Sequence, residues 1–173
     1  MRNPEQESNS FGISTGSCMS TLLEEFKSIT EALNDAGIEY AVCGGWAMAI
    51  HGLPRSTIDI DLLVLADDVE NAFSVARANG YDVEGLPLSF DRGAFELRRI
   101  SKIDSDRREL VTVDFLLVTE AFQDVWETRE DVDSQFGTLS VVSRDGLIKM
   151  KLLAGREQDL LDIKKLENDD GEN

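Results

Sequence analysis

Apolar residues first recur at helical spacing, after a polar start to the chain. Between Leu22 and Leu33 they follow the three- and four-residue steps of one helix face. Ser20 or Thr21 suits the N-cap, and Gly37 suits the C-terminal stop. The pattern predicts a helix that begins near residue 20. Residues 1–19 are rich in Asn, Ser, Glu and Gly without periodicity, which predicts a disordered N-terminal tail.

Apolar runs and turn residues then predict strands and helices in alternation, with the strands clustering later. The expected strands are residues 38–43, 58–65, 81–84, 93–100 and 111–118, with a hairpin around residue 137. The expected further helices are residues 46–50, 67–79, 119–129, 144–154 and 156–166. This order predicts an α+β fold, a mixed α/β sheet flanked by helices and closed by C-terminal helices. One domain over residues 20–166 then precedes an acidic tail, residues 167–173.

Two of the predicted strands carry acidic residues inside apolar runs. Asp59 and Asp61 are two apart, so their side chains share one face of a strand. We expect Ile58, Ile60 and Leu62 to face the core on the other side. Asp114 lies in the later run Val-Thr-Val-Asp-Phe-Leu-Leu-Val. If these two strands are neighbours, the three carboxylates converge.

Converging carboxylates repel one another unless a cation lies between them. Two unit charges ~6.5 Å apart repel by about 2.5 kcal/mol at an effective dielectric constant of about 20. Oxygen ligands without histidine suit Mg²⁺ or Mn²⁺ better than Zn²⁺. Asp59, Asp61 and Asp114 are therefore the candidate metal ligands. The ordinary alternative is a solvated Asp pair at the edge of a strand.

Composition and charge exclude several kinds of protein. The net charge of −17, from 17 basic and 34 acidic residues, disfavours non-specific binding to nucleic acid. The sequence still allows a locally basic cleft around the arginines at positions 92, 98, 99, 107 and 108. No apolar run is long enough to cross a membrane, and the start does not resemble a secretory signal. Two cysteines without a framework pattern indicate a reducing, cytoplasmic location.

The spacing of glycines and acids resembles that of a known superfamily. Tyr40-Ala-Val-Cys-Gly44-Gly45, followed by Arg55-Ser-Thr-Ile-Asp59-Ile-Asp61, is similar to the motif of nucleotidyltransferases of the polymerase-beta-like superfamily. Within it, the chain resembles small bacterial proteins of the AbiEii type and the lincosamide and aminoglycoside nucleotidyltransferases. The ending Lys-Met-Lys-Leu-Leu-Ala-Gly-Arg, residues 149–156, is similar to a closing helical segment of that group.

The resemblance implies both an activity and a set of site residues. The activity is magnesium-dependent transfer of a nucleoside monophosphate from an NTP such as ATP to a hydroxyl group. The acceptor is a small molecule, a protein or an RNA, and pyrophosphate is released. Asp59, Asp61 and Asp114 would be catalytic metal ligands. The residues implied to bind the nucleotide are Gly44, Gly45, Arg55, Thr57 and Lys149.

Other interpretations remain open from the residues themselves. The chain could be an interaction module with a protein partner, as in a toxin–antitoxin pair, that keeps the fold without the chemistry. A dinucleotide-binding domain fits less well, because the full Gly-x-Gly-x-x-Gly pattern is missing. Arg156 and Asp159 are three apart in a predicted helix, which predicts a structural ion pair. His51 is expected to have a structural role at the end of a short helix.

Overall fold

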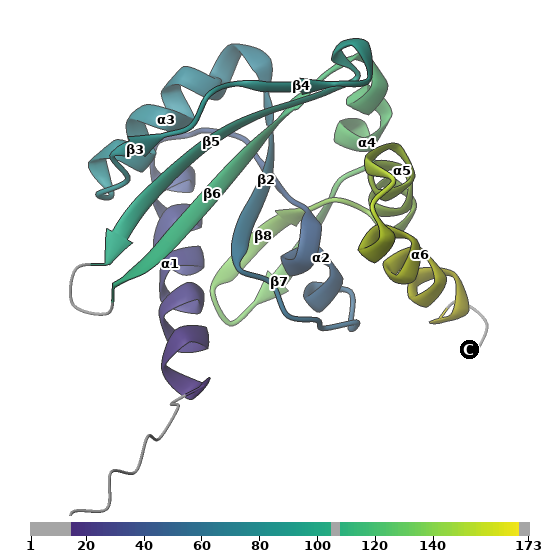
Figure 1. The fold of residues 1–173 in the computed structure, drawn as a ribbon, viewed down its shortest axis with the longest axis horizontal. Coiled ribbons are helices and arrows are strands. Elements are labelled where there is room, and N and C mark those ends of the chain that lie inside the picture. The colour runs from purple at the N-terminus through teal and green to yellow at the C-terminus, as the bar shows by residue number, and fades with distance from the viewer. Residues whose placement is uncertain (1–14, 105–107, 170–173) are drawn as a thin grey trace, which may run out of the picture.

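The computed structural model describes residues 15–104 and 108–169, with side chains described from residue 22 to residue 168 within these ranges. Helices flank a single eight-stranded sheet, which confirms the predicted mixed α/β architecture (Figure 1). The strands are β1 (Ala41–Val42), β2 (Asp59–Leu65), β3 (Val83–Glu84), β4 (Leu88–Phe90), β5 (Phe95–Asp104), β6 (Glu109–Val118), β7 (Glu130–Ser134) and β8 (Gly137–Val141). The α-helices are α1 (Thr15–Asp35), α2 (Gly44–Ile50), α3 (Val69–Ala78), α4 (Gln123–Glu127), α5 (Arg144–Ala154) and α6 (Glu157–Asp169).

Some element boundaries differ from those that the sequence predicts. Helix α1 begins at Thr15, so residues 15–19 are helical rather than part of a tail, and the rest of that predicted tail lies outside the described residues. Helix α6 continues to Asp169 and takes in the start of the predicted acidic tail, whose last four residues also lie outside. Strand β4 was not predicted, because three residues are too few for a clear alternation.

The sheet is mixed because two of its pairings are parallel. The strand order is β3-β5-β6-β2-β1-β8-β7, with β4 paired to β5. β2 runs parallel to β6, and β1 runs parallel to β8, while the other pairs are antiparallel. The two acid-bearing strands are therefore direct neighbours in the middle of the sheet.

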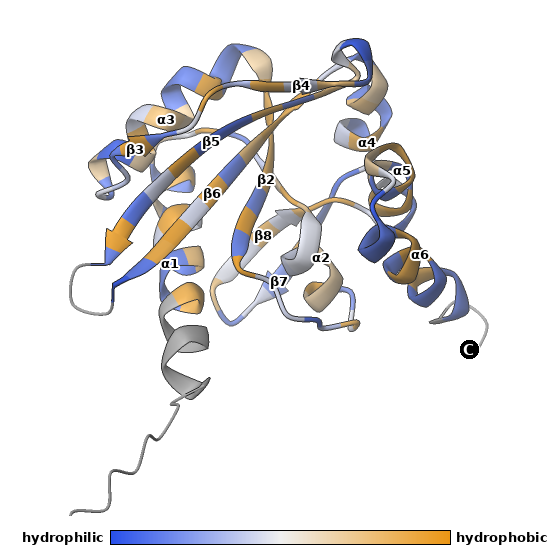
Figure 2. Ribbon diagram, viewed as in Figure 1, coloured by the Kyte–Doolittle hydropathy of each residue, from blue (hydrophilic) through white to orange (hydrophobic). Residues whose placement is uncertain are grey.

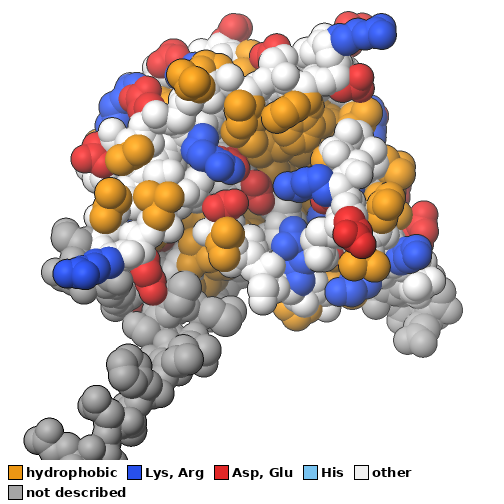
Figure 3. Space-filling view, in the orientation of Figure 1, with side chains coloured by type: hydrophobic (Ala, Val, Ile, Leu, Met, Phe, Trp, Pro, Cys, Tyr) orange, Lys and Arg blue, Asp and Glu red, His pale blue; other side chains and the backbone are white. Residues whose placement is uncertain are grey.

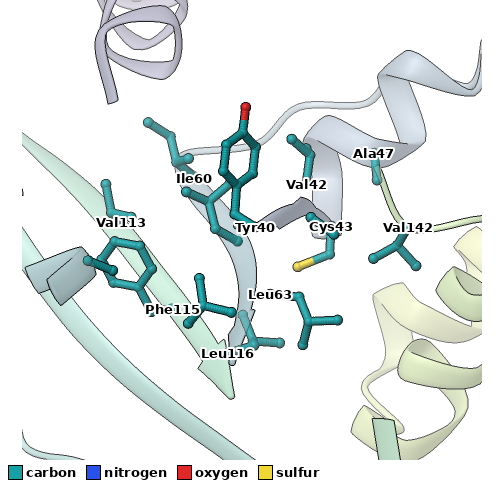
Figure 4. Packing of buried hydrophobic residues seen from close by; sticks show 14 of the residues in the cluster. Tyr40, Val42, Cys43, Ala47, Ile60, Leu63, Val113, Phe115, Leu116 and Val142 are labelled. Atoms are coloured by element: carbon teal, nitrogen blue, oxygen red, sulfur yellow. The ribbon is translucent and has the colours of Figure 1, made fainter. Parts of the chain in front are cut away.

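The side chains of β2 and β6 alternate between two different environments. Figure 2 shows polar and apolar positions interleaved along the central strands. Ile60, Val113 and Phe115 are fully buried on the face covered by α1 and α3, where the ring of Phe115 lies 5.6 Å from that of Phe73. Figure 4 shows this packing around β2 and β6. One prediction is wrong here: Ile58 is 77% exposed, because β2 begins only at Asp59.

None of the helices in the described part of the chain combines the length and apolar character that a membrane span requires.

Candidate active site

The three aspartates lie together at one cavity. Asp61 is directly opposite Asp114 in the parallel pairing of β2 and β6, so both side chains leave the sheet on the same face. Asp59 precedes Asp61 by two residues and shares that face. All three carboxylates line a cavity of about 620 Å³ between the sheet and the C-terminal helices. The convergence predicted from two separate apolar runs is therefore present in the fold.

Gly44 is required by the position of the Asp61 carboxylate. Gly44 has a φ of +60°, and a β-carbon added there would lie 1.9 Å from Oδ2 of Asp61. The backbone fixes the same arrangement, because the amide of Cys43 donates a hydrogen bond of 3.0 Å to the carbonyl of Asp61. The absence of a side chain at residue 44 thus makes room for an acidic group of the site.

Gly45 makes similar room for Thr57. A β-carbon at residue 45 would lie 2.7 Å from the Thr57 β-carbon. The Thr57 hydroxyl in turn donates to the carbonyl of Asp59 at 3.2 Å. The glycine pair therefore packs α2 against the start of β2. Gly44 and Thr57 line the cavity, whereas Gly45 does not.

An arginine from the neighbouring strand is bonded to the third acid. Arg99 of β5 is directly opposite Asp114 of β6. Its Nε and Nη2 donate to the two carboxylate oxygens of Asp114 at 2.7 and 2.6 Å. The same Nη2 lies 4.0 Å from Oδ2 of Asp59. Arg99 therefore supplies a positive charge among the carboxylates and holds both oxygens of Asp114.

The electrostatics of the site follow from burial and crowding. Burial and the negative charges of Asp114 and Asp59 raise the pKa of Asp61 to about 6. Burial and the charge of Asp114 also raise the pKa of Asp59, an effect that Arg99 opposes. Hydrogen bonding to Asp114 raises the pKa of Arg99, so this guanidinium stays charged. The cluster therefore holds more negative charge than Arg99 alone balances.

The three carboxylates have the chemistry that a hard divalent cation prefers, but both oxygens of Asp114 are already bonded to Arg99. Asp59, Asp61 and Asp114 offer oxygen donors, the type that Mg²⁺ prefers. Within residues 22–104 and 108–168, however, no three His, Cys, Asp or Glu side chains form a ready-made metal-binding group. The Arg99 guanidinium takes the position of a counter-cation beside Asp114. A metal bound to Asp114 would have to displace at least one of its bonds to Arg99.

The C-terminal helices bring a network of ion pairs to the cavity. Lys151 and Asp162 are both nearly fully buried, and Nζ of Lys151 donates to Oδ2 of Asp162 at 2.7 Å. Nε of Arg55 donates to the same oxygen at 2.9 Å. Arg156 bonds Asp159 at 2.7 Å, which confirms the predicted helical ion pair. The network ties the loop before β2 to the two closing helices and places three cations along the cavity wall.

The structure does not bring every predicted residue to the cavity. Arg55 lines the cavity, but Lys149 does not: its ammonium pairs with Asp124 at 2.6 Å on the outer side of α5. Lys151, two residues along the same helix, lines the cavity instead. His51 bonds the carbonyl of Val142 at 2.8 Å, in agreement with a structural role.

Sequence reasoning missed the roles of two side chains. Arg99 appeared only as one member of an arginine-rich region, and its partner follows from the register of β5 against β6. Arg98, its neighbour in the chain, points away and pairs with Glu70. Arg156 was assigned only a structural pair, although it also lines the cavity. Alternation within the strand could have separated Arg98 from Arg99, but it could not have identified the partner of either.

Solved structures resemble this fold across most of the chain. A candidate nucleotidyltransferase from Thermotoga maritima matches with a TM-score of 0.59 and 15% identity, over 87% of this chain and 94% of that one. ANT(2″)-Ia in complex with adenylyl-2″-tobramycin matches with a TM-score of 0.60 and 15% identity, over 84% of this chain and 87% of that one. A nucleotidyltransferase-like protein from Paracoccidioides brasiliensis matches with a TM-score of 0.57 and 17% identity, over 85% of this chain and 75% of that one.

These likenesses define a class of fold. The chain shares its fold with solved structures that are described as nucleotidyltransferases, the fold that the sequence motif led us to expect. Neither a search against protein-family models nor one of curated proteins found a match. The likeness to small bacterial toxins in particular is not supported by these neighbours.

Proposed function

We propose that this protein transfers a nucleoside monophosphate from an NTP to a hydroxyl acceptor and releases pyrophosphate. The observation that carries this proposal is the cavity in which Asp59, Asp61 and Asp114 share one face of two parallel strands. The nucleotidyltransferase fold of the neighbours supports the same reaction class. Asp59 and Asp61, with Asp114, would hold Mg²⁺ or Mn²⁺, which would neutralise charge on the phosphates and on the attacking and leaving oxygens.

Asp114 and the arginines of the cavity would carry out the remaining steps. Asp114 would accept the proton of the acceptor hydroxyl, after release of one carboxylate oxygen from Arg99. The hydroxyl oxygen would then bond to the α-phosphorus, while the bond from that phosphorus to the β-phosphate breaks and pyrophosphate leaves with its electron pair. Arg55 and Arg156 would attract the phosphates, because their guanidinium groups line the same cavity.

The bond between Arg99 and Asp114 also favours a second candidate function. A protein that keeps the fold as an interaction module has no need of free carboxylates. In that case Arg99 would permanently neutralise Asp114, and NTP would not bind in a magnesium-dependent way. The same measurement separates the two functions.

The test is the melting temperature with each of the four NTPs, with and without Mg²⁺. A ligand at one hundred times its dissociation constant adds about 2.7 kcal/mol to the free energy of unfolding. We expect at least one NTP to raise the melting temperature only when Mg²⁺ is present, and we expect Asp114→Asn to lose most of that increase. Absence of a magnesium-dependent shift with any NTP would support the interaction module instead.

Arg99→Gln is expected to tighten metal binding. A hydrogen bond between charged groups contributes about 1.5 kcal/mol or more, which corresponds to roughly tenfold in an equilibrium constant. The Arg99 guanidinium competes with a metal ion for Asp114. Its removal should therefore lower the dissociation constant of Mn²⁺, measured by electron paramagnetic resonance, by roughly tenfold. Arg98→Gln is the matched control, because Arg98 is the next residue and pairs with Glu70 away from the cavity. Equal Mn²⁺ affinity in both variants would contradict the competition.

A further inference from the structure

On the face of the sheet that lines the cavity, a row of charged side chains lies next to a row of apolar side chains. Arg99, Asp114 and Asp61 form one row across β5, β6 and β2. Two residues further, on the same face, Leu88, Leu97 and Leu116 form the next row across β4, β5 and β6. Figure 3 shows hydrophobic side chains gathered in a hollow of this face, with acidic and basic side chains beside them.

The apolar surface continues beyond the leucines. Phe90 and Phe95 are paired across β4 and β5, with ring centroids 6.3 Å apart. We call the five residues Leu88, Phe90, Phe95, Leu97 and Leu116 the apolar wall. All five line the cavity, and the side chains of Leu147, Met150 and Leu153 line it from α5. The part of the wall on β4 is accessible, since Leu88 is 41% and Phe90 is 55% exposed, while Leu97 and Leu116 are buried.

Two parts of the cavity lining thus differ in the chemistry that they favour. The loop before β2 and the closing helices contribute Arg55 and Arg156, guanidinium groups that suit the triphosphate of an NTP, while the nearby Lys151 is buried and bonded to Asp162. The apolar wall begins next to Asp114, the acid proposed to receive the proton of the acceptor. Apolar side chains exposed in a concave site gain free energy when an apolar surface covers them.

We infer that the acceptor is an uncharged alcohol or phenol on an aromatic or alicyclic skeleton, whose body lies on the apolar wall and whose hydroxyl reaches Asp114. This inference rests on the proposed function. A polycationic aminosugar would gain little from the apolar wall, because charged and strongly hydrated groups do not cover apolar side chains favourably. The cavity does hold carboxylates, but of these Asp114 is bonded to Arg99 and Asp159 to Arg156.

The test measures binding of two probes and of ATP to the full-length protein by calorimetry. The probes are naphthylmethanol, an uncharged aromatic alcohol, and tobramycin, a polycation. The variants are Phe90→Ser and Leu88→Ser, whose wild-type side chains are exposed enough for the fold to tolerate the change. Leu86→Ser is the matched control, because Leu86 is 84% exposed in the same segment and does not line the cavity.

We expect naphthylmethanol to bind the wild type and to bind Phe90→Ser and Leu88→Ser about tenfold more weakly. Leu86→Ser should bind as the wild type does, and the affinity for ATP with Mg²⁺ should change less than twofold in every variant. Loss of ATP affinity in the wall variants would instead assign the wall to the nucleobase and overturn the inference. Binding of tobramycin in place of naphthylmethanol, or of neither, would also overturn it. Failure of the proposed function would give a different result. In that case ATP with Mg²⁺ would not bind the wild type, whereas the binding of naphthylmethanol is measured separately, without ATP.

Discussion

Asp61→Asn is expected to abolish nucleotidyl transfer and, without metal, to make the protein more stable at neutral pH. The pKa of Asp61 is raised from 3.8 to about 6, first by burial and then by the charges of Asp114 and Asp59. The native state therefore binds a proton more tightly than the unfolded chain does. Above pH 6 the charged carboxylate destabilises the fold, by about 3 kcal/mol from 1.4 kcal/mol per pKa unit. Residual solvent contact reduces the expected gain for Asn to about 2 kcal/mol.

The sign of the pH dependence makes this prediction specific. Below about pH 4, Asp61 is protonated in both the native and the unfolded state, so the wild type and Asp61→Asn should unfold alike. The stability advantage of the variant should appear between pH 4 and 6 and stay constant above that range. Urea unfolding in a chelator at several pH values measures it, with Asp82→Asn as a control at an exposed acid outside the cavity. A variant less stable than the wild type at pH 7 would contradict the argument.

The effect of the same change on activity runs in the opposite direction. If Asp61 holds the metal, its loss should lower the transfer rate by roughly a thousandfold. A gain in stability together with a loss of activity is expected for a catalytic group that destabilises the folded state. Unchanged transfer by Asp61→Asn would remove this residue from the proposed metal site.

Gly44→Ala is expected to be among the most destabilising single substitutions to alanine at a glycine of this chain. At a φ of +60°, any L-residue bears backbone strain, of about 1–2 kcal/mol. In addition, the new β-carbon would lie 1.9 Å from the Asp61 carboxylate, so that α2 or Asp61 has to move. Overpacking of this kind costs about 1–3 kcal/mol more. The total expected loss is therefore about 2–5 kcal/mol, together with loss of transfer.

A second glycine makes it possible to separate backbone strain from the contact with Asp61 in the loss of stability. Gly37 has a φ of +69°, and no atom lies within 4 Å of a β-carbon built there. Gly37→Ala should therefore show the backbone strain alone. The difference between the two variants in urea unfolding then reports the contact with Asp61. Equal losses in Gly37→Ala and Gly44→Ala would mean that the carboxylate moves aside without cost.

Local sequence was sufficient to place the acids on strands. Alternation of apolar and polar residues located Asp59 and Asp61 on one strand and Asp114 on another, because strand side chains alternate with a period of two. The helical period of 3.6 residues predicted the closing helices and the Arg156–Asp159 pair. The strand period failed at strand ends, where too few residues show the alternation: Ile58 lies before β2 and is exposed, and β4 has only three residues.

The choice between nearby cations depended on how the helices pack. Lys149 and Lys151 are two residues apart on α5, and at about 100° per residue they lie on different sides of the helix. The sequence does not say which side meets the sheet. In the fold, α5 packs so that Lys151 is buried against Asp162 while Lys149 pairs with Asp124 outside.

By itself, then, the sequence determined which residues are acidic, which strands carry them and which face of each strand they occupy. The tertiary structure alone decided what those acids meet. The register of β6 against β2 and β5 sets Asp114 beside both Asp61 and Arg99, and the path of α2 brings Gly44 against the Asp61 carboxylate. The pairing of β4 with β5 completes the apolar wall. The physical reason is that side-chain periodicity is a local property of each strand, whereas register and packing are contacts between residues far apart in the chain.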